Sequence, residues 1–241
     1  MHTHLQAERN ERRASRSPSG PRAATAARAR VFLLSPANLA GLRAKTILEG
    51  TLRSPLVSRL HGEGAPLGEI FSFISGLYFR GKLAYARAFA APPAGVPGIL
   101  VITASGGLMS PDKILTVEQL RQVSSAAIDP SEPRYRLPLL RDAWRIRDRM
   151  DGDSDVVLLG SIATPKYVEP LLSVFGERLL FPSEFVGRGD MSRGGLMLRC
   201  QRAGIPLDCV PVSNAVLHGT RPARLPKMPP SLAARLAVDR L

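Results

Sequence analysis

The chain has 241 residues, of which 44% are hydrophobic, and a formal net charge of +13. This length and composition provide enough apolar surface for one large domain or two small ones. No apolar run reaches the roughly 18 to 20 residues that a membrane-spanning helix needs, and residues 1–30 hold no apolar segment of the secretory kind. We therefore expect a cytoplasmic protein without a membrane anchor.

The elements expected along the chain alternate between strand and helix. Residues 1–29 show no hydrophobic periodicity, and we expect a disordered basic arm there. Strands are expected at 31–34, 98–103, 155–159, 179–181 and 207–212, and helices at 39–48, 77–90, 117–124, 136–150, 165–175 and 191–202. The predicted fold class is therefore α/β, a mostly parallel sheet sandwiched by helices in three layers. A single domain is expected over 30–217, followed by a basic, Pro-rich tail over 218–241.

The helix expected at 136–150 is amphipathic. Its apolar residues, Leu137, Leu140, Trp144, Ile146 and Met150, lie on one face, and arginines lie on the other. This pattern favours a helix that covers the sheet with its apolar face. An arginine face turned toward DNA is the alternative.

The positive charge is concentrated at the two ends of the sequence. Residues 1–30 carry seven arginines against two glutamates, and residues 218–241 carry five basic residues against one aspartate. Basic arms of this kind hold nucleic acids without sequence specificity. Arginine outnumbers lysine 28 to 5, however, and a bias toward GC-rich codons would produce the same excess. Both explanations remain open at this point.

Small-residue loops follow four of the expected strands. They contain Ser35, Gly106-Gly107, Ser161 and the segment 183–195. Loops at the carboxyl ends of parallel strands line the ligand crevice of an open sheet, although glycines also serve plain chain reversal. The expected nucleic-acid- or phosphate-binding residues are Ser35, Asn38, Lys45, Tyr78, Arg80, Lys82, Ser105, Gly106, Gly107, Ser161, Thr164, Arg188, Ser192 and Arg193. The loops predict where a site lies and leave its reaction open.

Residues 75–82 combine aromatic and basic side chains with glycines, as base stacking beside phosphate pairing requires. A turn that feeds a core helix, with Tyr78 and Phe79 packed inside, explains the stretch equally well. The chain has no Walker A sequence, no dinucleotide-binding glycine motif after a strand and no GxSxG, which disfavours ATPases, dinucleotide-dependent dehydrogenases and α/β-hydrolases. Two cysteines and four histidines form no metal motif, so no metal and no other cofactor is predicted.

A carboxylate near these loops would be the nucleophile or base if the chain is an enzyme. The candidates are Asp190, Asp112 and Glu184. Asp190 lies between Arg188 and Arg193 in the sequence, and these cations would keep it ionised. The alternative role for Asp190 is to cap the following helix.

Several of these segments, taken in order, resemble the YaaA family of peroxide-stress proteins. Val31 to Lys45 (VFLLSPANLAGLRAK) is similar to that family's opening strand and Ser-Pro-Ala-Lys sequence, and Gly76 to Gly81 resembles its Gly-Asp-x-Tyr-x-Gly segment. Further similarities lie at 102–111, 161–167 and 192–199, so the resemblance spans roughly residues 31–200.

The resemblance implies a compact α/β fold related to uracil-DNA glycosylases, association with DNA and a role in oxidative stress. The sequence departs from the family pattern at Asn38, which stands for a lysine, at Leu77, which stands for an aspartate, and at Gly106, which stands for a tyrosine. The family's arginine near Gly195 is displaced by one position, at Arg193. The expected function is therefore a DNA- or nucleic-acid-associated protein, linked to DNA protection or repair. An enzyme that cleaves or transfers at the N-glycosidic bond of a nucleotide or nucleobase is the alternative.

Overall fold

A computed structural model describes residues 28–215, 219–220, 222–223 and 225, so most of the arm and of the tail expected at the two ends lies outside the described residues. The first described residues, Arg28 and Ala29, already contact the start of the strand at 155–159. The Arg28 guanidinium pairs with the buried Asp155 carboxylate at 3.4 Å, and the Ala29 carbonyl accepts a hydrogen bond from the Asp155 N–H.

The core is a six-stranded mixed sheet with the strand order β4-β3-β1-β6-β7-β8. Its inner strands β3 (Ile99–Ile102), β1 (Arg30–Leu34), β6 (Asp155–Leu159) and β7 (Leu179–Pro182) run parallel, while β4 (Leu108–Met109) and β8 (Cys209–Pro211) pair antiparallel at the edges. Strands β1 and β6 are almost wholly apolar and buried, as parallel strands covered on both faces must be. A separate pair joins β2 (Ala65–Pro66) to β5 (Ile114–Leu115).

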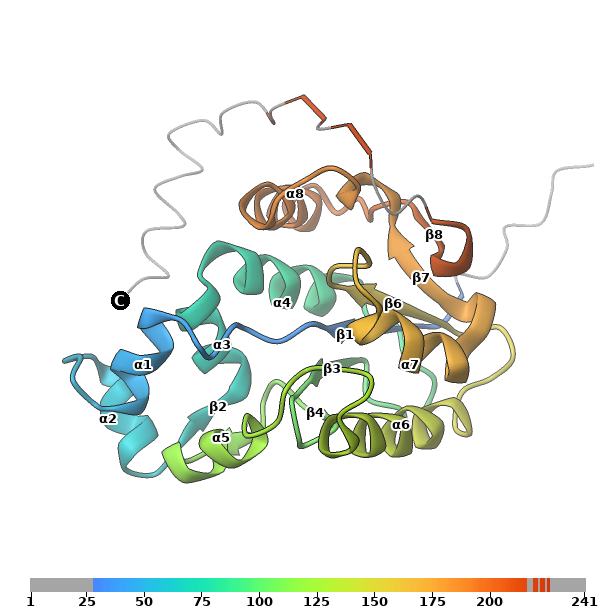
Figure 1. Ribbon diagram of the computed structural model, residues 1–241. Coiled ribbons are helices and arrows are strands. Elements are labelled where there is room, and N and C mark those ends of the chain that lie inside the picture. The colour runs from blue at the N-terminus through green and yellow to red at the C-terminus, as the bar shows by residue number, and fades with distance from the viewer. Residues whose placement is uncertain (1–27, 216–218, 221, 224, 226–241) are drawn as a thin grey trace, which may run out of the picture.

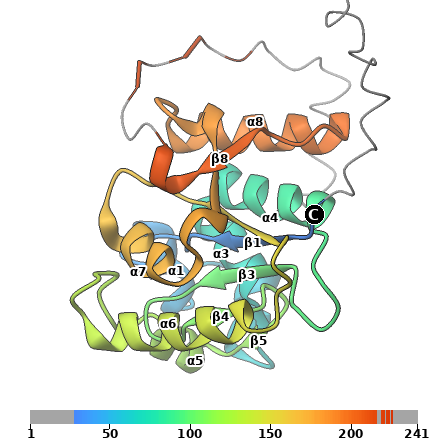
Figure 2. The same ribbon diagram turned by 90° about the vertical axis from the view of Figure 1, so that its right-hand side faces the viewer.

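Helices flank the sheet in two groups. On one side α4 (Leu77–Phe89) packs against α8 (Asp190–Ala203), and on the other α6 (Pro133–Arg147) packs against α7 (Pro165–Phe175), as Figures 1 and 2 show. The shorter helices are α1 (Leu42–Leu48), α2 (Pro55–His61), α3 (Leu67–Ser75) and α5 (Val117–Val123), with 3-10 turns at Gly176–Arg178, Ser183–Phe185 and Val212–Asn214. The predicted α/β class with a mostly parallel sheet is confirmed.

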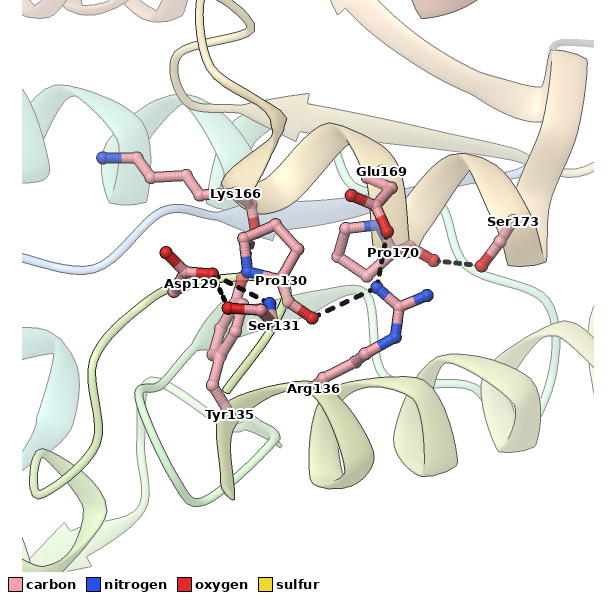
Figure 3. Close-up of polar contacts among 9 residues, drawn as sticks. All are labelled: Asp129, Pro130, Ser131, Tyr135, Arg136, Lys166, Glu169, Pro170 and Ser173. Atoms are coloured by element: carbon pink, nitrogen blue, oxygen red, sulfur yellow. Dashed lines mark hydrogen bonds and ion pairs between the residues drawn. The ribbon is translucent and has the colours of Figure 1, made fainter. Parts of the chain in front are cut away.

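The buried face of α6 differs from the expected one. Leu137 and Trp144 are 63% and 42% exposed, while Tyr135 and Leu139 are fully buried. Ile146 and Met150 are buried as predicted and Leu140 packs partly against the core, so the prediction was wrong for Leu137 and Trp144. The helix begins at Pro133, earlier than expected, and the added first turn brings Tyr135 into the buried face. Figure 3 shows the anchor of this arrangement, the Tyr135 hydroxyl donating to the Lys166 carbonyl of α7 at 2.6 Å.

Helices α4 and α8 touch through glycine. A Cβ atom on Gly81 would lie 2.6 Å from the carbonyl oxygen of Gly194, and a Cβ atom on Gly194 would lie 2.7 Å from that of Leu77. Both obstacles are backbone atoms, so no side-chain rotation would relieve the overlap. The two glycines allow the helices to approach closely, and this contact joins the element that carries Lys82 to the element that carries Asp190.

Candidate functional site

The ends of β1 and β6 form the point where the chain connections diverge. The chain leaving β1 leads to α4 on one face of the sheet, and the chain leaving the neighbouring β6 leads to α7 on the other. Open α/β sheets bind ligands in the crevice that such divergence leaves at the carboxyl ends of the strands. The fold therefore places its natural binding crevice between the loops that begin at Ser35 and Gly160.

A cavity of about 440 Å³ occupies this position. This volume falls within the range of small-molecule sites, roughly 300 to 1,000 Å³. Its walls come from the loop after β1, the loop after β6 and the ends of α3, α4, α7 and α8; the lining residues are Ser35, Pro36, Ala37, Asn38, Ser75, Tyr78, Ile128, Ser161, Lys166, Tyr167 and Asp190. Of the residues expected to bind, the cavity thus brings together Ser35, Asn38, Tyr78 and Ser161, and it includes the candidate carboxylate Asp190.

Ser35 directly follows β1 and is hydrogen-bonded to the end of β6. Its N–H donates to the Leu159 carbonyl at 3.1 Å, and its side chain is only 6% exposed. A Cβ atom on Gly160 would lie 3.0 Å from the Ser35 Cβ. Glycine at position 160 therefore leaves the room in which the Ser35 side chain sits against the cavity.

Lys82 is fully buried behind Ser35. Its ammonium donates to the Ser35 carbonyl and, at 2.9 Å, to the Ser35 Oγ, and it lies 4.5 Å from the centroid of the Tyr78 ring. Burial lowers the pKa of Lys82 to about 7, against a smaller opposing effect of the Asp190 charge. The side chain therefore exchanges its proton near neutral pH.

Tyr78 and Tyr167 line the cavity from α4 and α7. Burial raises the pKa of Tyr78 to about 12, although the Arg193 cation acts in the opposite direction. Burial, together with the nearby Tyr78 and Asp190, also raises the pKa of Tyr167. The Tyr78 hydroxyl is buried and makes no hydrogen bond of standard geometry to the described residues, although the Arg193 side chain lies close enough to lower its pKa through a polar contact. A buried hydroxyl without a partner costs free energy, and a ligand in the cavity would supply the missing bond.

The start of α7 gives the cavity a positive end. The N-cap residue Thr164 makes no side-chain hydrogen bond to the first turn, so it leaves the N–H groups of that turn uncapped by its hydroxyl. Lys166 lies in that turn, with its ammonium 5.1 Å from the centroid of the Tyr167 ring. Figure 3 shows its side chain extending away from the Arg136–Glu169 ion pair that joins α6 to α7. Helix N-termini with a neighbouring cation favour anions.

Asp190 is the first residue of α8, after the N-cap residue Gly189. Neither of the other two candidate carboxylates lines the cavity. Asp112 is exposed and pairs with Arg87 at 2.7 Å, and Glu184 is exposed in the turn after β7. The structure therefore leaves Asp190 as the candidate that a ligand in this cavity would meet.

The remaining expected binding residues lie around the cavity or away from it. Lys45 faces Glu49 at 3.8 Å on α1, and Arg80 on α4 is half-buried. Arg188 donates to the Glu184 carbonyl and to Ser192, while Arg193 donates to the Phe185 carbonyl. These arginines brace the turn that leads into α8.

The loop after β3 turns away from this cavity. Gly107 has φ +71°, and a Cβ atom there would collide with Asp142 and with the Pro138 carbonyl of α6. Gly106 accommodates the Thr103 side chain, and Ser105 donates to the Gln122 carbonyl at 2.6 Å. In the part of the chain that the structure describes, the two glycines therefore allow the loop to reverse direction and to pack closely against α6 and Thr103.

Lys166 and Tyr167 were missing from the residues expected to bind. The sequence could have indicated them. Lys166 and Tyr167 lie in the first turn of the helix that follows the Ser161 loop, and side chains in that turn face the crevice. Ser75 begins the stretch 75–82 considered for base stacking but was not among the residues expected to bind, because no pattern predicted α3, whose last residue it is.

A second cavity, of about 510 Å³, lies against the first and shares Pro36, Ala37, Asn38 and Ile128 with it. Its other walls are mostly apolar and come from the β1 loop, α1, α3, β3 and α5; they are Leu39, Ala40, Leu48, Phe71, Thr103, Ala104, Arg121, Val123, Ser124 and Ala126. The segment Pro36–Asn38 thus separates a polar compartment from an apolar one.

Comparison with protein-family models, curated proteins and solved structures gave no match to this chain. The resemblance to the YaaA family accordingly remains a prediction from the sequence. Within the described residues, no helix is long and apolar enough to span a membrane, and no group of three or more His, Cys, Asp or Glu side chains is arranged to hold a metal ion.

Proposed function

We propose that this chain is a nucleic-acid-associated protein with a YaaA-like fold whose polar cavity takes a single nucleotide, either free or extruded from a strand. The observation that carries the proposal is the cavity itself. It combines a positive end at Lys166 and the start of α7 with the buried Tyr78 hydroxyl, which makes no hydrogen bond of standard geometry to the described residues. A phosphate suits the first feature, and a hydrogen-bonding base or sugar suits the second.

The size of the cavity favours a nucleotide over a stretch of duplex. A volume of about 440 Å³ encloses a ligand of drug size, whereas a duplex needs an extended surface. Enzymes that act on a base inside a duplex extrude it into such a pocket. The resemblance of residues 31–200 to a DNA-binding family supports the same proposal, and the basic ends of the sequence supply the charge that would hold the strand.

Nucleotide binding is tested by calorimetric titration of the full chain with deoxynucleoside monophosphates and with the matching nucleosides. We expect the monophosphates to bind at least about tenfold more tightly, because a charge-assisted hydrogen bond contributes about 1.5 to 3 kcal/mol. Lys166→Gln is expected to remove most of that difference. Lys113→Gln, which changes an exposed lysine outside both cavities, serves as the matched control. Equal affinity for nucleosides and monophosphates would contradict the assignment of the positive end.

Association with DNA is tested by titrating a labelled duplex at several salt concentrations. Removing residues 1–27 takes away five arginines and two glutamates while keeping Arg28 and its partner Asp155. The full chain is expected to lose about a hundredfold or more in affinity between 50 and 200 mM salt, and the truncated chain markedly less, because fewer counterions are released. A full chain that fails to bind duplex or single strands at low salt would refute this part of the proposal.

Cleavage of an N-glycosidic bond is the second candidate function, and the position of Asp190 on the cavity wall favours it. The carboxylate would stabilise the positive charge that develops on the sugar, or activate water against it. Asp190→Asn would then abolish release of a base from a bound nucleotide while leaving nucleotide affinity nearly unchanged. Full release by that variant would remove Asp190 from the mechanism.

A further inference from the structure

Ser35 and Lys82 form a pair that nucleotide binding does not require. Ser35 lines the cavity, and the Lys82 Nζ lies 2.9 Å from the Ser35 Oγ, while Lys82 itself is not among the lining residues. Lys82 is 0% exposed, so the hydroxyl stands between the amine and any ligand. A hydroxyl in contact with a base on one side and a binding cavity on the other is the arrangement of an activated nucleophile.

The surroundings of Lys82 allow it to work as a base. Tyr78 and Phe79 present their rings to it at 4.5 and 4.8 Å, and the charge that acts on it is that of Asp190 from α8. Burial outweighs that charge and brings the pKa of Lys82 to about 7. A neutral amine is therefore present at neutral pH, and a neutral amine accepts the proton of the hydroxyl to which its ammonium form donates.

We propose that Ser35 is a nucleophile and Lys82 its general base, and that the pair cleaves carboxylic esters through an acyl-Ser35 intermediate. The Ser35 Oγ attacks the carbonyl carbon while its proton passes to the Lys82 Nζ. The bond from carbon to the leaving oxygen breaks, and the Lys82 ammonium returns the proton to the leaving alcohol. Water then attacks the acyl carbonyl carbon, the bond from that carbon to the Ser35 Oγ breaks, and a proton of the water passes to the Ser35 Oγ. The carboxylic acid leaves and the Ser35 hydroxyl is restored.

The two compartments indicate what kind of ester would fit. Ser35 lies at the start of the segment Pro36–Asn38 that separates the apolar cavity of about 510 Å³ from the polar one of about 440 Å³. Of the two cavities Ser35 lines the polar one, so the acyl group of an ester bound there would extend past Pro36–Asn38 to reach the apolar residues Leu48, Phe71 and Val123. Its polar alcohol, carrying an anionic group, would lie in the compartment of Lys166. The substrate class is therefore an apolar acyl ester of a polar, anionic alcohol.

The proposal is tested by treating the full chain with an alkyl fluorophosphonate at pH 8 and locating the adduct by mass spectrometry. The Ser35 oxygen forms a bond to phosphorus and fluoride leaves, so the reaction reports an activated serine without requiring any nucleotide. We expect one adduct, on Ser35. Ser35→Ala is expected to abolish it, and Ser58→Ala, which changes an exposed serine on α2, to retain it. An unlabelled wild-type chain, or an adduct retained in Ser35→Ala, would overturn the proposal.

The role of Lys82 is tested by the rate of the same labelling. Lys82→Met is expected to slow it at least about a hundredfold, within the range that a general base contributes. The wild-type rate is expected to rise about tenfold between pH 6 and pH 8, since Lys82 loses its proton there. The pH profile is measured on the wild type, so it tests whether Lys82 is the general base even if Lys82→Met does not fold. A flat profile, or a Lys82→Met chain labelled at the wild-type rate, would refute general-base catalysis by Lys82.

Hydrolysis is followed with p-nitrophenyl butyrate, whose acyl chain is apolar. Release of p-nitrophenol that disappears in Ser35→Ala supports ester cleavage at this serine, and release that survives that substitution counts against it. Failure of nucleotide binding would leave these results unaffected, so the two proposals stand or fall separately.

Discussion

Replacing Gly194 by alanine is expected to lower the free energy of unfolding by about 2 kcal/mol, although alanine is the better helix former by about 1 kcal/mol. The added Cβ would lie 2.7 Å from the Leu77 carbonyl oxygen and 2.9 Å from the Tyr78 Cα. Since these are backbone atoms of α4, the two helices would have to separate. That movement would also displace Tyr78, Lys82 and Asp190, so nucleotide binding and fluorophosphonate labelling are expected to weaken together.

Gly195→Ala is the matched control for this substitution. Among the described residues its Cβ would meet only Leu225 Cδ1, at 4.0 Å, so the helix-propensity gain is expected to appear there without a clash. Urea unfolding of the two variants beside the wild type measures both effects. If Gly194→Ala proved as stable as Gly195→Ala, the contact between α4 and α8 would be looser than described, and the glycines would have another role.

The parallel sheet could be predicted from the sequence because its inner strands are apolar on both faces. Val31–Leu34 and Val156–Leu159 are continuous apolar runs, and in a chain with helices between them such runs indicate buried parallel strands. Helix α7 was predicted to the residue, because Pro165 opens it and Gly176 ends it. The ends of a helix could be predicted from the sequence where a proline or a glycine marks them.

The buried face of α6 and the existence of α3 depended on tertiary contacts. Tyr135 lies inside because its hydroxyl finds the Lys166 carbonyl on α7, a partner 31 residues away. A single-sequence pattern could not show that Trp144 would remain half-exposed beneath Arg147. Helix α3 begins at Leu67 directly after the short strand β2, with no polar capping residue to mark its start.

The candidate site was predicted as a rim of loops but not as a pair of reactive groups. Ser35 and Ser161 were named because they follow strands, and the structure brings both to one cavity. Lys82 was expected to bind phosphate, whereas the structure buries it 47 residues along the chain from its partner Ser35. Burial of a charge follows from how α4 packs against β1 and α8, and no spacing in the sequence encodes that packing.

Replacing Lys82 by methionine is expected to stabilise the protein at pH 6, by about 1 to 3 kcal/mol, because methionine fills a similar volume without a buried charge. The gain should shrink as the pH rises and reverse before pH 10. The pKa of Lys82 is about 7 in the folded protein and near its ordinary value of 10.5 in the unfolded chain. Between these values the unfolded chain holds a proton that the folded protein lacks. The free energy of unfolding of the wild type therefore rises with pH across this window, relative to the variant, by at most about 1.4 kcal/mol per pH unit.

Urea unfolding of both chains at pH 6, 8 and 10 measures the difference directly. Other groups with shifted pKa values, such as Tyr78, are shared by the two chains and largely cancel. Lys113→Met changes an exposed residue, and its free energy of unfolding is expected to equal that of the wild type at every pH. A constant gap between wild type and Lys82→Met would mean that Lys82 carries the same charge in the folded and unfolded states over this range. In that case the amine is not neutral near pH 7, and Ser35 has no base in contact with it.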